Sequence, residues 1–425
     1  MSEQIVFDGN YSAVINFAMQ QNHVPVINRL EIKNIIEAPL ENIRVTIRTE
    51  PQFSHLWETK VDRLASGASL NLGAPALLLR PEYLLSLTER IAGNLLIEAW
   101  QGKNCIGQAV QAIDVLAFDE WAGEHAMPEI LAAFVTPNHP RISALIRSGS
   151  ELMEKWTGRS SFTGYLSNNP NMVRMQMAAL YEAIRRSELE YCVAPASFEQ
   201  DGQRVRLADT IAEQKMANCL DLTLLYAGCL EAVGLYPLLI LLKGHAFAGC
   251  WLEKECFAEC VQEDVSLLTK RMADGVNEIA AVECTSAAKG GTAFEQAAAA
   301  AQKQLSADDF EYLIDVHRTR GSGIRPLPLK KSAFNGEVYV AEKPEAAADA
   351  AAPQEMTVLQ KIQQVDAVQM TRQQLWERKL LDLSLRNPLL NFRVTRSAIQ
   401  LLCGNLSELE DALSGGQSFQ LLARP

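Results

Sequence analysis

The sequence predicts a multidomain chain in which an all-β sandwich precedes an α+β domain, a linker and a short helical segment. Three features predict this order. Apolar and polar residues alternate at strand spacing up to about residue 120, helical periodicity begins at Pro128, and a stretch rich in Ala, Glu, Asp and Pro runs from Gly336 to Gln354. We expect the domains to cover 1–125 and 126–335, with a flexible linker at 336–370 and a helical part at 371–425.

Composition restricts the class of protein. The chain has 425 residues, enough for two or three domains, and its hydrophobic fraction of 48% suits packed cores. The net charge of −12 argues against binding nucleic acid by broad phosphate neutralisation. The opening MSEQIVFDGN lacks the apolar core of a secretory signal, so we expect a cytoplasmic protein whose nine cysteines are reduced.

The first region reads as short antiparallel strands. Residues Asn42 to Arg48 alternate apolar and polar side chains, which is the period of a half-buried strand. Similar runs are expected to form strands at Val24 to Ile32, Tyr83 to Ile91 and Leu95 to Trp100. Strands at this spacing, separated by Gly, Asn and Pro, predict an immunoglobulin-like sandwich without catalytic residues.

Helical patterns dominate the second region. Segments at Pro128 to Phe134, Met172 to Arg186 and Thr292 to Leu305 are expected to be helices, the last with an alanine face that packs closely on a neighbour. The apolar stretch from Leu220 to Leu242 has the length of a membrane span. Because charged residues, a glycine and a proline interrupt it, a buried helix followed by a buried strand is expected, with no membrane contact.

The last region begins with a new helix near Thr371. Trp376, Leu380 and Leu383 fall on one helical face, and the helix is expected to stop at Asn387-Pro388. The residues that follow are too few for a full domain, so we expect this region to be the start of something larger.

The most informative local pattern is Asn218-Cys219-Leu220-Asp221 at the start of the buried helix. Asn218 is a good N-cap, and Asp221 at the third helical position can complete a capping box. Cys219 would then lie at the first helical position, where the helix dipole favours the nucleophilic thiolate. The alternative is a small buried hydrophobe near a helix start.

A base for this cysteine is available downstream. Pro237 to Lys243 reads as a buried strand, which Gly244 to Gly249 is expected to continue, with His245 between small residues. The next strand-like run ends with Glu283, a charge that needs a partner if it is buried. A carboxylate that accepts from the imidazole would orient His245 as the base for Cys219. Taken singly, His245 has the alternative of a satisfied core histidine, and Glu283 that of a surface charge at the end of a strand.

Other candidates are weaker. His317 lies in a polar, basic stretch and is expected to be a solvated surface residue, while Gln203 is a candidate oxyanion donor whose alternative is a surface amide. Cys250, Cys256, Cys260 and Cys284 invite a zinc interpretation, but their spacing lacks the two-residue interval of a zinc knuckle. No metal and no cofactor are expected.

The segment NCLDLTLLYAGCLEAVGLYPLLILLKGHAFAGCWL resembles the core of transglutaminase-like cysteine proteins. In that family a Cys opens the central helix, and a His followed by a small residue and an aromatic comes after a strand. Cys219, Asp221, His245 and Phe247 match this arrangement. The resemblance covers about seventy residues and implies a papain-like α+β fold. Glu283 takes the place of the usual Asp, and Asn218 that of the usual Gly.

A second resemblance lies at Leu380 to Arg393, LLDLSLRNPLLNFR. This segment resembles the opening of very large bacterial helicase-like proteins, in which a transglutaminase-like module and a β-sandwich precede a helicase region and often a nuclease. The resemblance implies the amino-terminal part of such a protein, with a role in antiviral defence. The sequence contains no GxxxxGK[ST] phosphate loop, so this chain is not expected to be the ATPase itself.

Together these patterns predict acyl transfer on a protein amide by Cys219, His245 and Glu283, with Gln203 as the weaker oxyanion donor. The expected partner is a protein or peptide substrate. The sequence does not choose between proteolysis and crosslinking, and the resemblance to the transglutaminase-like family favours proteolysis. A helicase or nuclease region of the same parent protein or complex is a second expected partner. The competing hypothesis is a binding or regulatory module in which the triad has degenerated.

Overall fold

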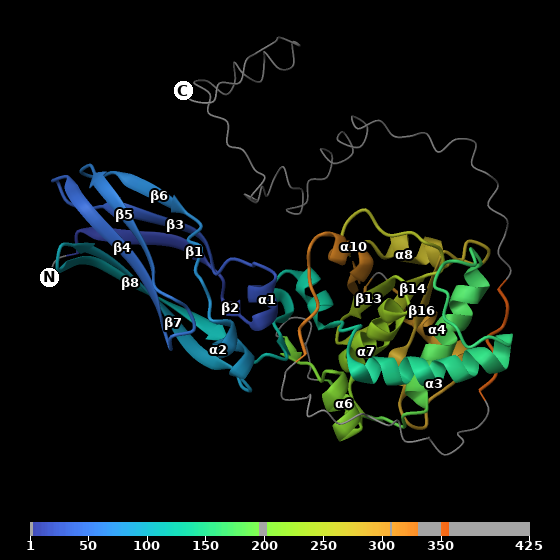
Figure 1. Cartoon of the computed structure of the whole chain (residues 1–425). Coiled ribbons are helices and arrows are strands. Elements are labelled where there is room, and N and C mark those ends of the chain that lie inside the picture. Colours follow the sequence, from blue (N-terminus) through green and yellow to red (C-terminus); the bar gives the residue numbers. More distant parts are fainter. Residues whose placement is uncertain (1–2, 195–201, 307, 330–349, 357–425) are drawn as a thin grey trace, which may run out of the picture. The chain divides into compact units, whose positions relative to one another are not determined.

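Two β-sheets form the amino-terminal part of the chain, drawn in blue in Figure 1. The structure, a computed structural model, describes residues 3–194, 202–306, 308–329 and 350–356. The strands are β1 (Ile5–Tyr11), β2 (Val14–Ile15), β3 (Ile27–Asn34), β4 (Leu40–Glu50), β5 (Trp57–Leu64), β6 (Ser69–Gly73), β7 (Ile91–Gln101) and β8 (Asn104–Val115). One sheet has the order β1-β3-β6 and the other β2-β8-β7-β4-β5. Ile32 of the first sheet and Val45 of the second share one apolar cluster, so the sheets pack face to face.

A third sheet organises the following region. Its strands are β13 (Pro237–Leu242), β14 (His245–Trp251), β15 (Val261–Gln262), β16 (Ile279–Val282) and β17 (Phe310–Asp315), in the order β15-β17-β13-β14-β16. All pairs are antiparallel. Two short ladders lie outside this sheet: β9 (Glu120–Trp121) pairs with β11 (Gln203–Arg204), and β10 (Glu190–Tyr191) pairs in parallel with β12 (Met216–Ala217).

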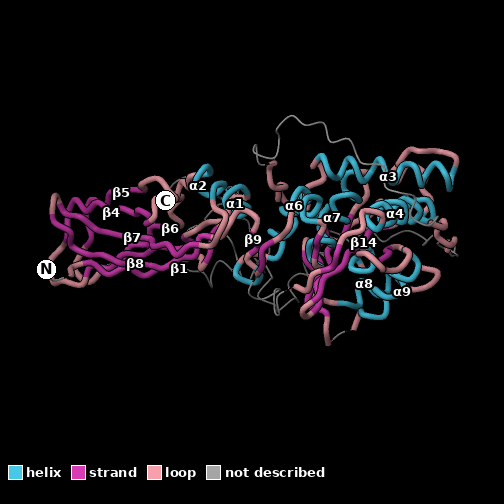
Figure 2. Tube along the Cα trace, turned by 90° about the horizontal axis from the view of Figure 1, so that it is seen from below, coloured by secondary structure: helices cyan, strands magenta, loops and turns pink. Residues whose placement is uncertain are grey.

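Helices cover both faces of the third sheet. The helices in the described part of the chain, including α1 and α2 of the amino-terminal region, are α1 (Phe17–Gln21), α2 (Pro81–Ser86), η1 (Gly123–His125), η2 (Pro128–Phe134), α3 (Pro140–Thr157), α4 (Pro170–Arg185), α6 (Ala208–Gln214), α7 (Cys219–Ala232), α8 (Val265–Met272), η3 (Cys284–Ala287), α9 (Phe294–Gln304) and α10 (Val316–Gly321), where η marks a 3-10 helix. Helix α7 contacts β13 and β14 on one side and α3 and α4 on the other, as Figure 2 shows. Leu268 of α8 packs with Leu238 and Ile240 of β13.

Helix α7 is the centre of this region. Every residue from Cys219 to Leu230 is buried, which agrees with the nearly uniform apolar character of the segment. The helix stops before Gly234, whose φ of 83° lets the chain turn back into β13. A helix held on all sides by packing fixes the position of its first residue.

The expected combination of helices with several sheets is confirmed, and some elements differ from the sequence prediction. Tyr83 to Ile91 was predicted to be a strand, but α2 occupies its first part because Pro81 opens a helical turn there. Residues Pro128 to Phe134 form a 3-10 helix. Gly244 does not continue the preceding strand: its φ of 67° closes a turn, and His245 starts the second strand of a hairpin.

The structure describes only a small part of the regions predicted to be a linker and a helical segment. The chain divides into Met1–Leu359 and Gln360–Pro425, and the second unit lies outside the described residues. Of the linker predicted at 336–370, only 350–356 is described, and this segment is bound to helices rather than free. The helical part predicted at 371–425 also lies outside the described residues. Among the helices that the structure describes, none is long and apolar enough to cross a membrane.

Candidate active site

The start of α7 places Cys219 at the first helical position. Asn218 caps the helix: its side chain accepts from the Asp221 backbone N–H at 2.9 Å, and the Asp221 carboxylate accepts from the Asn218 N–H at 3.0 Å. This reciprocal capping box satisfies two backbone donors that the helix leaves unpaired. The Cys219 side chain is buried, with 1% of the residue exposed.

Asp221 ties the start of α7 to the segment that follows β11. Its carboxylate also accepts from the Arg206 backbone N–H at 2.8 Å and from the Arg206 guanidinium at 3.1 Å. Burial raises the pKa of Asp221, and the hydrogen bonds from Asn218 and Arg206 oppose that rise. These contacts fix the Arg206 backbone beside the start of α7.

The hairpin between β13 and β14 supplies the imidazole. His245 pairs with Leu242 across the two-residue turn. Its side chain is 24% exposed, more open than the strand residues that follow it. Since β14 lies against α7, the turn brings His245 to the end of the helix where Cys219 lies.

Glu283 follows β16, the strand beside β14, and orients the imidazole. Its Oε2 atom lies 2.7 Å from His245 Nε2. Its other oxygen, Oε1, accepts from the Thr285 backbone N–H at 3.0 Å and from the Thr285 hydroxyl at 2.7 Å. These bonds lower the pKa of Glu283 although burial acts to raise it. A charged carboxylate is thereby fixed on one edge of the imidazole.

Cys219 is the second group that interacts with the His245 imidazole. Burial acts to lower the pKa of His245, but hydrogen bonds with Cys219 and Glu283 outweigh it and raise the pKa to about 9. The structure thus brings Cys219, His245 and Glu283 together in the order that the sequence predicts.

Gln203 is buried, contrary to the alternative of a surface amide. Only 5% of the residue is exposed, and its Oε1 lies 3.5 Å from Asn218 Nδ2. Its Nε2 has no hydrogen-bond partner within the described part of the chain. The preceding Gly202 has a φ of 78°, and a Cβ there would lie 2.2 Å from the Trp121 carbonyl oxygen. A glycine is therefore needed for this strand to approach Trp121 and to place Gln203 beside the cysteine helix.

Tyr191 is a neighbour of the site that sequence reasoning missed. It lies on β10, paired with the strand that leads directly into Asn218. Burial, then the charges of Cys219 and Glu283 and a hydrogen bond with Cys219, raise the pKa of its hydroxyl to about 12. A single tyrosine in a two-residue strand has no sequence signal of its own, and only the β10–β12 pairing brings it to the thiol.

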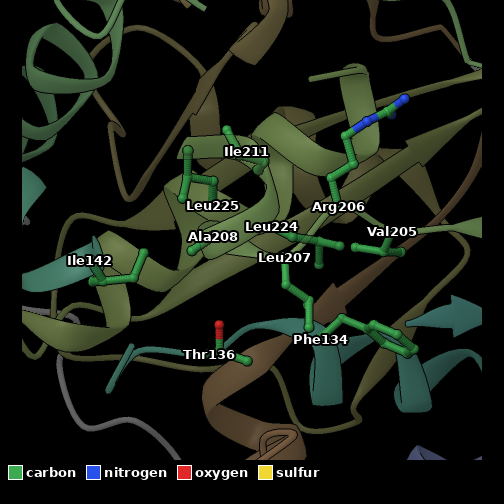
Figure 3. A pocket seen from close by; sticks show the side chains of 10 residues that line it. All are labelled: Phe134, Thr136, Ile142, Val205, Arg206, Leu207, Ala208, Ile211, Leu224 and Leu225. Carbon is green, nitrogen blue, oxygen red and sulfur yellow. The ribbon is translucent and has the colours of Figure 1, made fainter. Parts of the chain in front are cut away.

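The pocket shown in Figure 3 is not this site. Its walls include Phe134 and Ile142, and it meets α7 at Leu224 and Leu225 rather than at Cys219. The lining is mainly apolar and contains none of the three residues above. The candidate active site is therefore the Cys219 end of α7, and its support is the arrangement of the side chains there rather than a cavity.

Among the residues that the structure describes, the other cysteines do not form a second centre. Burial raises the pKa of the Cys250 and Cys284 thiols, which keeps them in the unreactive neutral form. Within the described ranges, no group of three or more His, Cys, Asp or Glu side chains has the arrangement of a metal site. His317 is exposed and stacks on Tyr236, with 3.6 Å between ring centroids.

Comparisons with known proteins concern the carboxy-terminal end alone. Residues 379–425 match a family described as a protein of unknown function, DUF4011. No curated protein matches the chain. The matched range contains Leu380 to Arg393, the segment of the second resemblance, and lies outside the described residues. The matched range does not include Cys219, His245 or Glu283, so the candidate active site rests on its geometry alone.

Proposed function

We propose that residues 126–335 form a transglutaminase-like, papain-like domain that transfers acyl groups from protein amides through Cys219. One observation carries the proposal: Glu283 holds the His245 imidazole at 2.7 Å, and Cys219 lies close enough to the same imidazole to raise its pKa. A cysteine at the start of a buried helix, an oriented imidazole and a buried carboxylate are the parts that a thiol nucleophile requires.

In the proposed reaction, the Cys219 thiolate attacks the carbonyl carbon of an amide while His245 carries the proton. The resulting oxyanion accepts hydrogen bonds from the Cys219 N–H, which has no intrahelical acceptor, and from the Gln203 side-chain amide. His245 then protonates the leaving amine and a thioester remains. Attack by water, with its proton passing to His245, completes hydrolysis. We favour proteolysis over crosslinking by an amine.

The test is labelling with an acylating probe for cysteine nucleophiles, located by mass spectrometry. The wild-type chain should be labelled at Cys219, and both Cys219→Ala and His245→Ala should abolish that label. Glu283→Gln should slow labelling by about 10- to 100-fold, because the imidazole loses its orienting charge. A folded chain that labels elsewhere, or not at all, would contradict the proposal.

The second candidate is a binding or regulatory module that has lost catalysis. Its support is the burial of Cys219, of which 1% is exposed, since a substrate carbonyl needs room to reach the sulfur. On this account His245 and Glu283 would stabilise the fold and bind no reacting group. Labelling of Cys219 that depends on His245 would exclude it.

We also propose that this chain is the amino-terminal module of a helicase-like protein that acts in antiviral defence. The support is the resemblance of Leu380 to Arg393 to the segment that opens the helicase-associated region of such proteins. Co-purification of the chain with a separately expressed helicase region is the direct test. Absence of that association would leave the cysteine proposal standing, because the two rest on different residues.

A further inference from the structure

Residues 350–356, which we call the strap, are bound along α3, α4 and α9, and Figure 1 shows them as the short orange segment. At one end Ala350 packs with Leu152 and Met153 of α3, and its carbonyl accepts from the Trp156 indole N–H at 3.2 Å. At the other end Asn171 of α4 holds Met356 through both of its backbone groups. The strap is therefore fixed at both ends.

An ion pair between two helices forms hydrogen bonds with the backbone in the middle of the strap. Arg174 of α4 and Glu295 of α9 form a two-pronged pair at 2.7 and 2.6 Å. Arg174 also donates to the Gln354 carbonyl at 2.8 Å, and Glu295 accepts from the Gln354 backbone N–H at 2.8 Å. Both backbone groups of Gln354 are thus bound by charged side chains, which form the stronger class of hydrogen bond.

These contacts reach the candidate active site through one turn of α9. Glu295 lies in the first turn of α9, and the Ala297 carbonyl in the same turn accepts from the Glu283 backbone N–H at 3.1 Å. Glu283 in turn holds His245. The α9 start is also fixed to α4, because Glu182 accepts from the Phe294 N–H at 3.2 Å.

We propose that the strap is a docked latch that ties the chain leading to the carboxy-terminal region to the Glu283 arm of the site. Its occupant is this chain's own extended segment, bound by its backbone. When the strap is seated, Glu295 and the first turn of α9 are fixed and so is the Glu283 main chain. When it is withdrawn, that turn loosens. The latch stands on its own contacts, and its effect on catalysis rests on the proposed function.

The test compares Gln354→Pro with Gln354→Ala in the full chain by amide hydrogen exchange. Proline removes the N–H that Glu295 binds, while alanine keeps it and removes only the side chain. Gln354→Pro should speed exchange of the Met356 and Glu283 amides by about tenfold, the loss expected for one hydrogen bond to a charged group. Gln354→Ala should leave both amides unchanged. The Ile240 amide in β13 serves as the reference for global unfolding.

Each other outcome overturns part of the latch. Equal effects of proline and alanine would mean that the side chain, not the backbone, is bound. Faster exchange at Met356 with no change at Glu283 would show a docked strap without coupling to the site. An unprotected Met356 amide in the wild-type chain would show that the strap is not seated. None of these readouts depends on enzymatic activity, so they stay separate from a failure of the acyl-transfer proposal.

Discussion

The sandwich region, residues 3–115, and the region around the candidate site, residues 126–329, bury different kinds of polar group. In the described part of the sandwich region, the buried polar side chains are neutral: Asn16, Asn34, Thr46, Thr49 and Ser54. Its ion pairs, such as Arg29–Asp8 and Arg48–Glu50, are exposed. The region around the candidate site instead buries charged side chains: Arg174, Glu182, Asp221, Glu283 and Asp315.

This difference helps to distinguish buried charges that stabilise the fold from buried charges that belong to the candidate site. A buried charge costs several kcal/mol unless hydrogen bonds replace its water, so it persists where it fixes a backbone or performs chemistry. Asp221 and Asp315 each accept from a backbone N–H group at a helix start and have structural roles. Glu283 is also bound by a backbone N–H, but its second oxygen holds a titratable imidazole. That partner distinguishes the site from the scaffold.

The largest expected contrast compares Asp221→Ala with Asp8→Ala. Removal of Asp221 leaves the Asn218 and Arg206 N–H groups buried without an acceptor, so the free energy of unfolding should fall by about 3–5 kcal/mol. Asp8 belongs to an exposed ion pair, and its removal should cost less than about 1 kcal/mol. Urea denaturation of both variants gives the comparison. Equal losses would show that burial does not divide the two regions.

A smaller effect is expected at Gln203, on the rate of acylation. Gln203→Ala should reduce acylation of Cys219 by p-nitrophenyl acetate about 10²- to 10³-fold, because an oxyanion donor is lost. Alkylation of Cys219 by iodoacetamide forms no oxyanion and should be unchanged. Because the variant also loses a buried side chain and the 3.5 Å contact with Asn218 Nδ2, urea denaturation must show that it is folded before the rates are compared. If both reactions slow equally, Gln203 is not an oxyanion donor.

The smallest expected effect is the pH dependence contributed by His245. Its pKa is raised from 6.5 to about 9 in the folded chain, so its stabilisation is complete below pH 6.5 and is lost as the pH rises through about 9. The difference in unfolding free energy between wild type and His245→Gln should therefore shrink by up to about 3 kcal/mol between pH 6 and pH 9.5. Urea titrations at the two pH values measure it. A constant or growing difference would contradict the contact with Glu283.

The sequence predicts the parts of the site that depend on local pattern. Asn218, Cys219 and Asp221 form a capping box that three neighbouring residues specify. The order of a buried helix, a hairpin strand and a strand ending in Glu283 also follows from apolar runs and their interruptions. The order of these elements was sufficient to identify His245 and Glu283 as candidates, although the turn at Gly244 was predicted to be continuous strand.

Contacts between distant segments escaped prediction because no local pattern encodes them. Tyr191 reaches the thiol only through the pairing of two-residue strands. The strap was predicted to be flexible because composition describes its side chains, whereas Gln354 is bound through its backbone. Gln203 had no signal for burial, which depends on the close approach of Gly202 to Trp121.

The most direct test of the central claim is the rate at which iodoacetamide alkylates Cys219 at pH 6, read by mass spectrometry. The exposed Cys256 of the same chain is the internal reference. If His245 and Glu283 activate the thiol, Cys219 should react at least about tenfold faster than Cys256, and His245→Gln should remove the advantage. A Cys219 that reacts no faster than Cys256 at pH 6, in a folded chain, would contradict an activated nucleophile.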